Sequence, residues 1–236
     1  MILTVSRSDV TGAINYGLSP YLNFPPSLTP PTWYVLPPST VPQTLLRMTA
    51  LLSPHGIHHS LIQILASLSL FVQTLNLTRS NPGILLSPEA FSNDLYTLEH
   101  CLLSLPSTLL SPAHELALSV ALRFSALICL KAVLQEFSHS VNGSKILVER
   151  VRESLGCVWM GDECEEKGGF LAWMCVLCAA AANGEVREWF VERLGTLQVQ
   201  YAACDELGMD RLLNLNAIFN KECIENIWQE ARTPQR

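Results

Sequence analysis

Residues 168–194 read GGFLAWMCVLCAAAANGEVREWFVERL, and this stretch combines two segments of different character. The first has no charged residue from Phe170 to Ala182, and the second alternates charged with aromatic and aliphatic residues after Asn183-Gly184. The charge-free run has 13 residues, whereas a membrane span needs about 20. A helix that is apolar on every side is typical of the centre of a helical domain. The stretch therefore predicts a buried helix, a break at Asn183-Gly184, and a second helix.

The second helix should be amphipathic. Glu188 and Glu192 are expected to face outward. Arg187, just past the break, is expected to be partly exposed or to bind a carboxylate or helix-end carbonyls. The inward face is expected to carry Val186, Trp189, Phe190, Leu194 and Leu197.

The Cys-x-x-Cys pair of the first helix, Cys175 and Cys178, raises the question of a metal site. Structural zinc takes four ligands, usually as two closely spaced pairs. The other cysteines nearby, at 157, 164, 204 and 223, form no second pair of this kind. A redox role needs the strand and turn that normally present such a pair, and these are missing. The pair, like Trp173 between its helical neighbours, is therefore assigned to the core.

Helical signals continue along most of the chain. Ser87, Pro88 and Glu89 form a helix start, with a cap, a proline at the first position and an acid near the positive end of the dipole. Asn142-Gly143 is expected to end a helix, and Ser144 to cap the next one. No run of alternating apolar and polar residues predicts strands. We expect an all-α fold, a single irregular domain of about eight or nine helices.

The N-terminal region differs in composition. Eight of the fourteen prolines fall within the first 42 residues. Proline at this density disfavours regular helix, so we expect residues 1–42 to form a Pro-rich linker or arm and residues 43–236 to form the helical domain. The five aromatic residues of the arm suggest that part of it docks on the domain. A ligand for a proline-recognition module is the alternative.

Charge and hydropathy exclude several classes of protein. The net charge is −6 with 15% charged residues, and no basic cluster suited to nucleic acid occurs. The N-terminus has no basic start followed by a long apolar stretch, so no secretory signal is predicted and the eight cysteines are expected to be free thiols. A second charge-free run, residues 60–78, carries polar side chains and is interpreted as an internal helix rather than a membrane span.

Other groups of polar residues give weak signals. His55, His58 and His59 are interpreted as part of a surface connection, and the acidic run that begins at Gly161 as a solvated link between helices. No nucleophile elbow, dinucleotide-binding glycine pattern or phosphate loop is present. We therefore predict no catalytic, cofactor-binding or metal-binding residues, no cofactor and no enzymatic activity.

Three segments carry a family resemblance: FLAWMCVLCAAAA at 170–182, REWFVERL at 187–194 and LLNLNAIFNKECIENIWQEA at 212–231. Their order resembles the C-terminal part of the fungal-specific transcription factor domain, and the resemblance covers about residues 85–236. It implies an all-α regulatory region downstream of a binuclear zinc-cluster module. That module needs six closely spaced cysteines, and the first 100 residues contain none.

Two functions are therefore considered. The first is a non-catalytic regulatory or interaction domain without its own DNA-binding module, either a stand-alone relative or part of a longer regulator. The resemblance implies a nuclear protein, otherwise a cytoplasmic one. Its expected partners are proteins of the transcription machinery or a second copy, with a possible small-molecule effector and without direct nucleic acid or membrane binding. The alternative is a helical small-molecule-binding protein or enzyme of fungal secondary metabolism, which a deep pocket with converging charged residues would favour.

Overall fold

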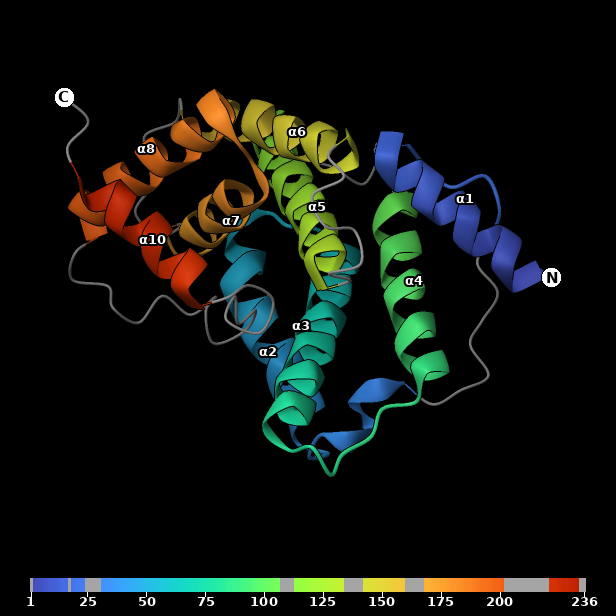
Figure 1. Ribbon diagram of the computed structural model, residues 1–236. Helices are drawn as coiled ribbons and strands as arrows, with labels where there is room; N and C mark the ends of the chain where they lie inside the picture. The colour runs from blue at the N-terminus through green and yellow to red at the C-terminus, as the bar shows by residue number, and fades with distance from the viewer. Residues whose placement is uncertain are drawn as a thin grey trace. The chain divides into compact units, whose positions relative to one another are not determined.

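The structure is a computed structural model, and it describes residues 2–16, 18–23, 31–106, 113–133, 142–159, 168–201 and 221–233. Within these ranges the chain forms nine α-helices and two short 3-10 helices, with no strand (Figure 1). The predicted all-α fold is thereby confirmed.

The chain divides into two compact units, Met1–Ser119 and Val120–Arg236. This division differs from the arm and single domain expected from the prolines, because the first 42 residues belong to the first unit. The expectation that these residues lack regular helix is wrong for α1 (Ile2–Tyr16). The physical reason is that the first proline is Pro20, so nothing in α1 blocks a helix.

In the first unit, α3 (His59–Ser80) contacts α2 (Thr40–Leu52), α4 (Pro88–Ser104) and the 3-10 helix η1 (Thr32–Val35). It is long and apolar enough to cross a membrane by length and composition, but 61% of its most apolar 18-residue window is buried inside the protein. Such burial is that of a core helix, in keeping with the interpretation of residues 60–78 as internal.

Polar contacts attach the N-terminal region to α4, which lies beside α1 (Figure 1). Arg7 Nη2 on α1 donates a hydrogen bond of 2.6 Å to Asn93 Oδ1. The backbone N–H of Thr32 donates to Asp94 Oδ2 at 2.6 Å, so the carboxylate satisfies a donor at the start of η1. Burial raises the pKa of Asp94, and the hydrogen bonds from Thr32 oppose that shift. Part of the predicted arm therefore docks, as expected.

The histidine segment is a helix connection, as predicted. After α2, the 3-10 helix η2 (Ser53–His55) ends at Gly56, whose φ of 70° is readily adopted only by glycine. His58 then caps α3, because its Nδ1 accepts a hydrogen bond of 3.2 Å from the N–H of Ser60.

The start of α4 (Pro88–Ser104) agrees with the sequence prediction, and the start of α6 (Asn142–Trp159) does not. Ser87 caps α4 through a hydrogen bond from the N–H of Ala90 at 3.4 Å, with Pro88 at the first position, so this prediction is confirmed. The prediction that Asn142-Gly143 ends a helix is wrong, since α6 (Asn142–Trp159) begins at Asn142. An Asn-Gly pair disfavours helix by about 1 kcal/mol, an amount that the apolar residues further along α6 can offset by burial. α5 (Ala113–Val133) precedes it along the chain.

The second unit has α7 (Gly168–Ala181) at its centre, in contact with α6, α8 (Gly184–Tyr201) and α10 (Lys221–Arg232). Every residue from Phe170 to Cys178 is buried, as predicted for an apolar helix. The break before α8 is also confirmed, because α7 ends at Ala181 and Gly184 adopts a φ of 57°. In Figure 1 the three C-terminal helices α7, α8 and α10 lie together.

Two of these helices touch through their backbones. A Cβ atom placed on Gly195 of α8 would lie 2.7 Å from the carbonyl oxygen of Ala231 on α10. Real Cβ atoms do not approach a carbonyl oxygen this closely, so the spacing of α8 and α10 requires glycine at this position.

Gly195→Ala should lower the free energy of unfolding by about 1–3 kcal/mol, because the added methyl group forces α10 away from α8. Gly156→Ala on α6 is the matched control: a Cβ there meets no atom within 4 Å, and alanine favours helix by about 0.5–1 kcal/mol. Chemical denaturation of both variants measures the difference. Equal stabilisation by the two substitutions would contradict the close contact.

Candidate functional site in the C-terminal helices

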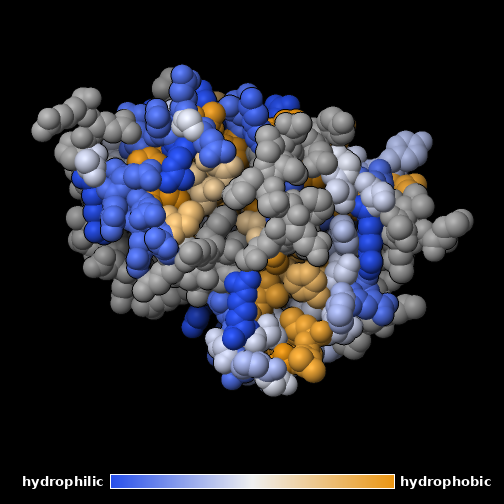
Figure 2. All heavy atoms as spheres, viewed as in Figure 1, coloured by the Kyte–Doolittle hydropathy of each residue, from blue (hydrophilic) through white to orange (hydrophobic). Residues whose placement is uncertain are grey.

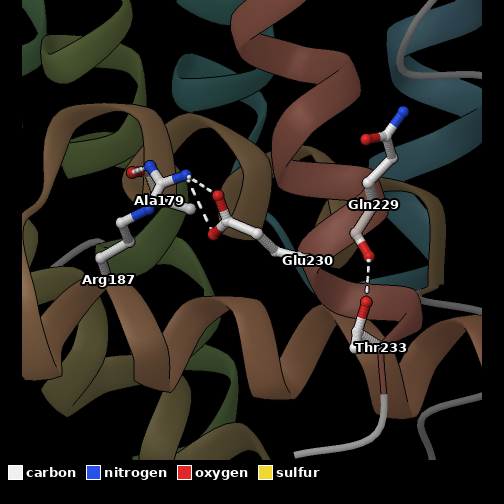
Figure 3. Close-up of polar contacts among 5 residues, drawn as sticks. All are labelled: Ala179, Arg187, Gln229, Glu230 and Thr233. Atoms are coloured by element: carbon white, nitrogen blue, oxygen red, sulfur yellow. Dashed lines mark hydrogen bonds and ion pairs between the residues drawn. The ribbon is translucent and has the colours of Figure 1, made fainter.

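Arg187 lies in the first turn of α8 and joins all three C-terminal helices (Figure 3). Its Nη1 donates a hydrogen bond of 2.7 Å to the carbonyl oxygen of Ala179 near the end of α7. Its Nη2 donates to both carboxylate oxygens of Glu230 on α10, at 2.9 and 3.1 Å. Both partners expected for Arg187, a carboxylate and a helix-end carbonyl, are therefore present.

The two contacts of Arg187 differ in environment. Glu230 is 48% exposed, and ion pairs in contact with water contribute only about 0–1 kcal/mol. Ala179 is fully buried, and its carbonyl belongs to the last turn of α7, where helix carbonyls lack partners and the helix dipole is negative. A guanidinium group at this position satisfies a buried acceptor, so we assign the larger share of the stabilisation to the bond with Ala179.

The two tryptophans predicted to be buried differ. Trp173 on α7 is 2% exposed, which confirms its core position. Trp189 on α8 is only half-buried, so the prediction of a largely buried side chain is wrong there, as it is for Val186. Helical spacing alone does not explain this result, because Val186 lies four residues before Phe190 and therefore on the same face. The packing of α8 buries Phe190, Leu194 and Leu197 and leaves Val186 and Trp189 half-buried.

The half-buried Trp189 is held by its neighbours. Its ring packs edge-on against Phe190, with ring centroids 4.9 Å apart, and the guanidinium of Arg193 lies 5.4 Å from the Trp189 ring centroid. An arginine over an indole face is a favourable cation–π arrangement. Glu188 and Glu192 beside this cluster are exposed, as predicted.

The cysteine pair lies in the core. Cys175 and Cys178 are both fully buried, as is Cys129 on α5. Burial raises the pKa of Cys129 to about 12 and raises the pKa of both α7 thiols, with the charge of Arg193 opposing the shift at Cys175. These thiols are therefore protonated at neutral pH, whereas nucleophilic and zinc-binding cysteines are thiolates.

The acidic run begins at Gly161, and its part before α7, residues 161–167, lies outside the described residues. Cys164 and Cys204 lie outside them as well. In the part of the chain that the structure describes, no three histidine, cysteine or acidic side chains come together in a way that could hold a metal ion.

Asp94 was missed by the sequence reasoning. It is 7% exposed and lies between Ala90 and Leu98 on the buried side of α4. The sequence did contain a signal for its burial: Asp94 lies four positions from each of two apolar residues, so all three share one face of the helix. Its pKa, like those of Cys101 and Arg123, is shifted chiefly by burial.

No protein family, curated protein or solved structure matches this chain.

Trp173→Ala should cost about 3–5 kcal/mol of the free energy of unfolding, because it leaves a large cavity in the core. Trp189→Ala should cost about 1–2 kcal/mol, because only part of its ring is buried. Trp173→Phe should be milder than Trp173→Ala, because the phenyl ring leaves a smaller cavity, while both substitutions remove an indole N–H that is buried without a partner among the described residues. Urea denaturation would rank the variants, and a larger loss for Trp189→Ala would contradict this placement.

Arg187→Ala should cost about 1–3 kcal/mol, because it leaves the buried Ala179 carbonyl without its donor. The matched control is Arg150→Ala on α6, where the arginine is 60% exposed and pairs at 3.6 Å with Glu153, an interaction that should contribute close to nothing. Glu230→Gln should cost less than Arg187→Ala. Thermal melts that place Arg187→Ala level with Arg150→Ala would refute the assigned role.

Proposed function

We propose that the chain is a non-catalytic regulatory or interaction domain that acts through its helical surfaces, in fungal transcription as the resemblance implies. It would work in the nucleus and leave DNA recognition to another module or protein. One observation carries this proposal: polar side chains that an enzyme could use for chemistry form hydrogen bonds that join one helix to another.

Three contacts illustrate that use. Arg187 links α7, α8 and α10, Arg7 links α1 to α4, and Asp94 links η1 to α4. In each case a donor on one helix forms a hydrogen bond with an acceptor on another helix. Such contacts fix the geometry of a scaffold and present its outer faces in a defined arrangement.

The outer faces of α8 and α10 supply the surface with which a partner would interact. Figure 2 shows hydrophilic residues over these two helices. Exposed acidic side chains follow helical spacing on α8 at Glu185, Glu188 and Glu192. The half-buried Trp189 with Arg193 over its ring adds two of the three residue types that most often dominate binding energy at protein interfaces.

A reporter assay tests this function. The chain is fused to an unrelated sequence-specific DNA-binding domain in a fungal host, and expression of a reporter next to the cognate site is measured. We expect a several-fold change in expression relative to the DNA-binding domain alone. A folded fusion at matched abundance that leaves the reporter unchanged would contradict the proposal.

Surface variants sharpen the assay. Trp189→Ala and the double substitution Glu188→Lys with Glu192→Lys should reduce the effect, while Glu149→Lys with Glu153→Lys on α6 makes the same charge change elsewhere and should not. Melting temperatures of the purified variants separate a lost surface from a lost fold. Turnover or tight binding of a small molecule by the same chain, without any effect on the reporter, would instead support the enzyme or ligand-binding alternative.

A further inference from the structure

Thr233 directly follows α10 and begins the sequence Thr-Pro-Gln-Arg at 233–236. Proline-directed protein kinases require proline after the acceptor residue, and many of them prefer lysine or arginine two positions after that proline. Only Thr233 among the Ser-Pro and Thr-Pro pairs of this sequence meets both conditions. The other pairs begin at Ser19, Thr29, Ser53, Ser87 and Ser111.

The position of Thr233 suits modification. Its side chain is exposed, so a kinase can reach the hydroxyl group. Thr233 Oγ1 donates a hydrogen bond of 3.0 Å to the carbonyl oxygen of Gln229, and its N–H donates to the carbonyl oxygen of Glu230 at 3.1 Å (Figure 3). Thr233 therefore closes the last turn of α10 with two hydrogen bonds.

We propose that Thr233 is a phosphorylation site for a proline-directed kinase and that the phosphate loosens α10 from α7 and α8. The kinase transfers the γ-phosphoryl group of a nucleoside triphosphate. A bond forms between Thr233 Oγ1 and the γ-phosphorus, while the bond from that phosphorus to the β,γ-bridging oxygen breaks. The nucleoside diphosphate leaves with the electron pair, and the hydroxyl proton passes to a base of the kinase.

Phosphorylation removes one hydrogen bond at the end of α10 and adds negative charge that destabilises the last turn of the helix. The ester oxygen has no proton, so it cannot donate to the Gln229 carbonyl. The phosphate also places about two negative charges beside the last carbonyls of the helix, where the helix dipole is already negative.

Among the described residues, the cations near Thr233 do not reverse this effect. Both Nη atoms of Arg187 are already engaged, and in Figure 3 the Thr233 hydroxyl lies on the Gln229 side of α10, away from Arg187. Arg232 is the preceding residue, and adjacent helical positions point about 100° apart, which is a poor arrangement for a pair. Strain at the last turn is transmitted to Glu230 and to Ala231, where α10 touches Gly195.

The first experiment tests the site. The purified full chain is incubated with a proline-directed kinase and ATP, and the modified residue is located by peptide mass spectrometry. We expect phosphate on Thr233, none on the Thr233→Val variant, and a several-fold slower reaction for Arg236→Ala. Ser87 is an internal control, because it is followed by proline but has Ala90 in place of the basic residue and its hydroxyl caps α4. Modification of Ser87 with Thr233 left unmodified would overturn the proposal.

The second experiment tests the loosening of α10. Hydrogen exchange of the α10 amides is compared in the unmodified chain, the phosphorylated chain and Thr233→Val, which loses the hydroxyl group without gaining charge. We expect phosphorylation to speed exchange of α10 by roughly three- to tenfold, more than the valine substitution does, while α6 is unaffected. Exchange that stays the same, slows, or rises only to the level of Thr233→Val would refute the role of the charge.

Discussion

The burial of α7 on all sides is the constraint on which the second unit depends. A helix without a polar face cannot lie on a surface without exposing apolar side chains, at about 25 cal/mol for each Å². It therefore needs neighbours around it, and α6, α8 and α10 supply them. The same burial keeps the thiols of Cys175 and Cys178 protonated, so a pattern that resembles a metal or redox motif is a packing motif in this fold.

Polar side chains act mainly at the ends of helices. Arg187 donates to a carbonyl in the last turn of α7, Asp94 accepts an N–H from the first residue of η1, and Ser87 caps α4. Helix ends leave backbone groups without partners, and side chains from elsewhere in the chain satisfy some of them. In the part of the chain that the structure describes, polar side chains at helix ends therefore help to decide how helices meet, while the apolar residues decide how deeply the helices are buried.

Local patterns in the sequence predict much of this structure. The all-α fold, the apolar α7, the break before α8, the cap of α4 and the bond from Arg187 to the end of α7 all follow from residues close together in the chain. Two other features depend on tertiary context. Trp189 and Phe190 are adjacent and both aromatic, yet only the packing of α8 distinguishes their burial. Contact of Gly195 with Ala231 depends on a helix 36 residues away, and no local signal indicates it.

The length of α10 has a consequence for the turnover of the protein. An isolated helix of 12 residues is barely stable in water, so α10 is helical because it is docked. Undocking and unfolding of this segment are then one event, and the released form is an extended peptide that carries Ile224, Ile227 and Trp228. Proteases cleave extended chain far more readily than helix. Whatever weakens the hold on α10 should therefore also shorten the lifetime of the protein in the cell.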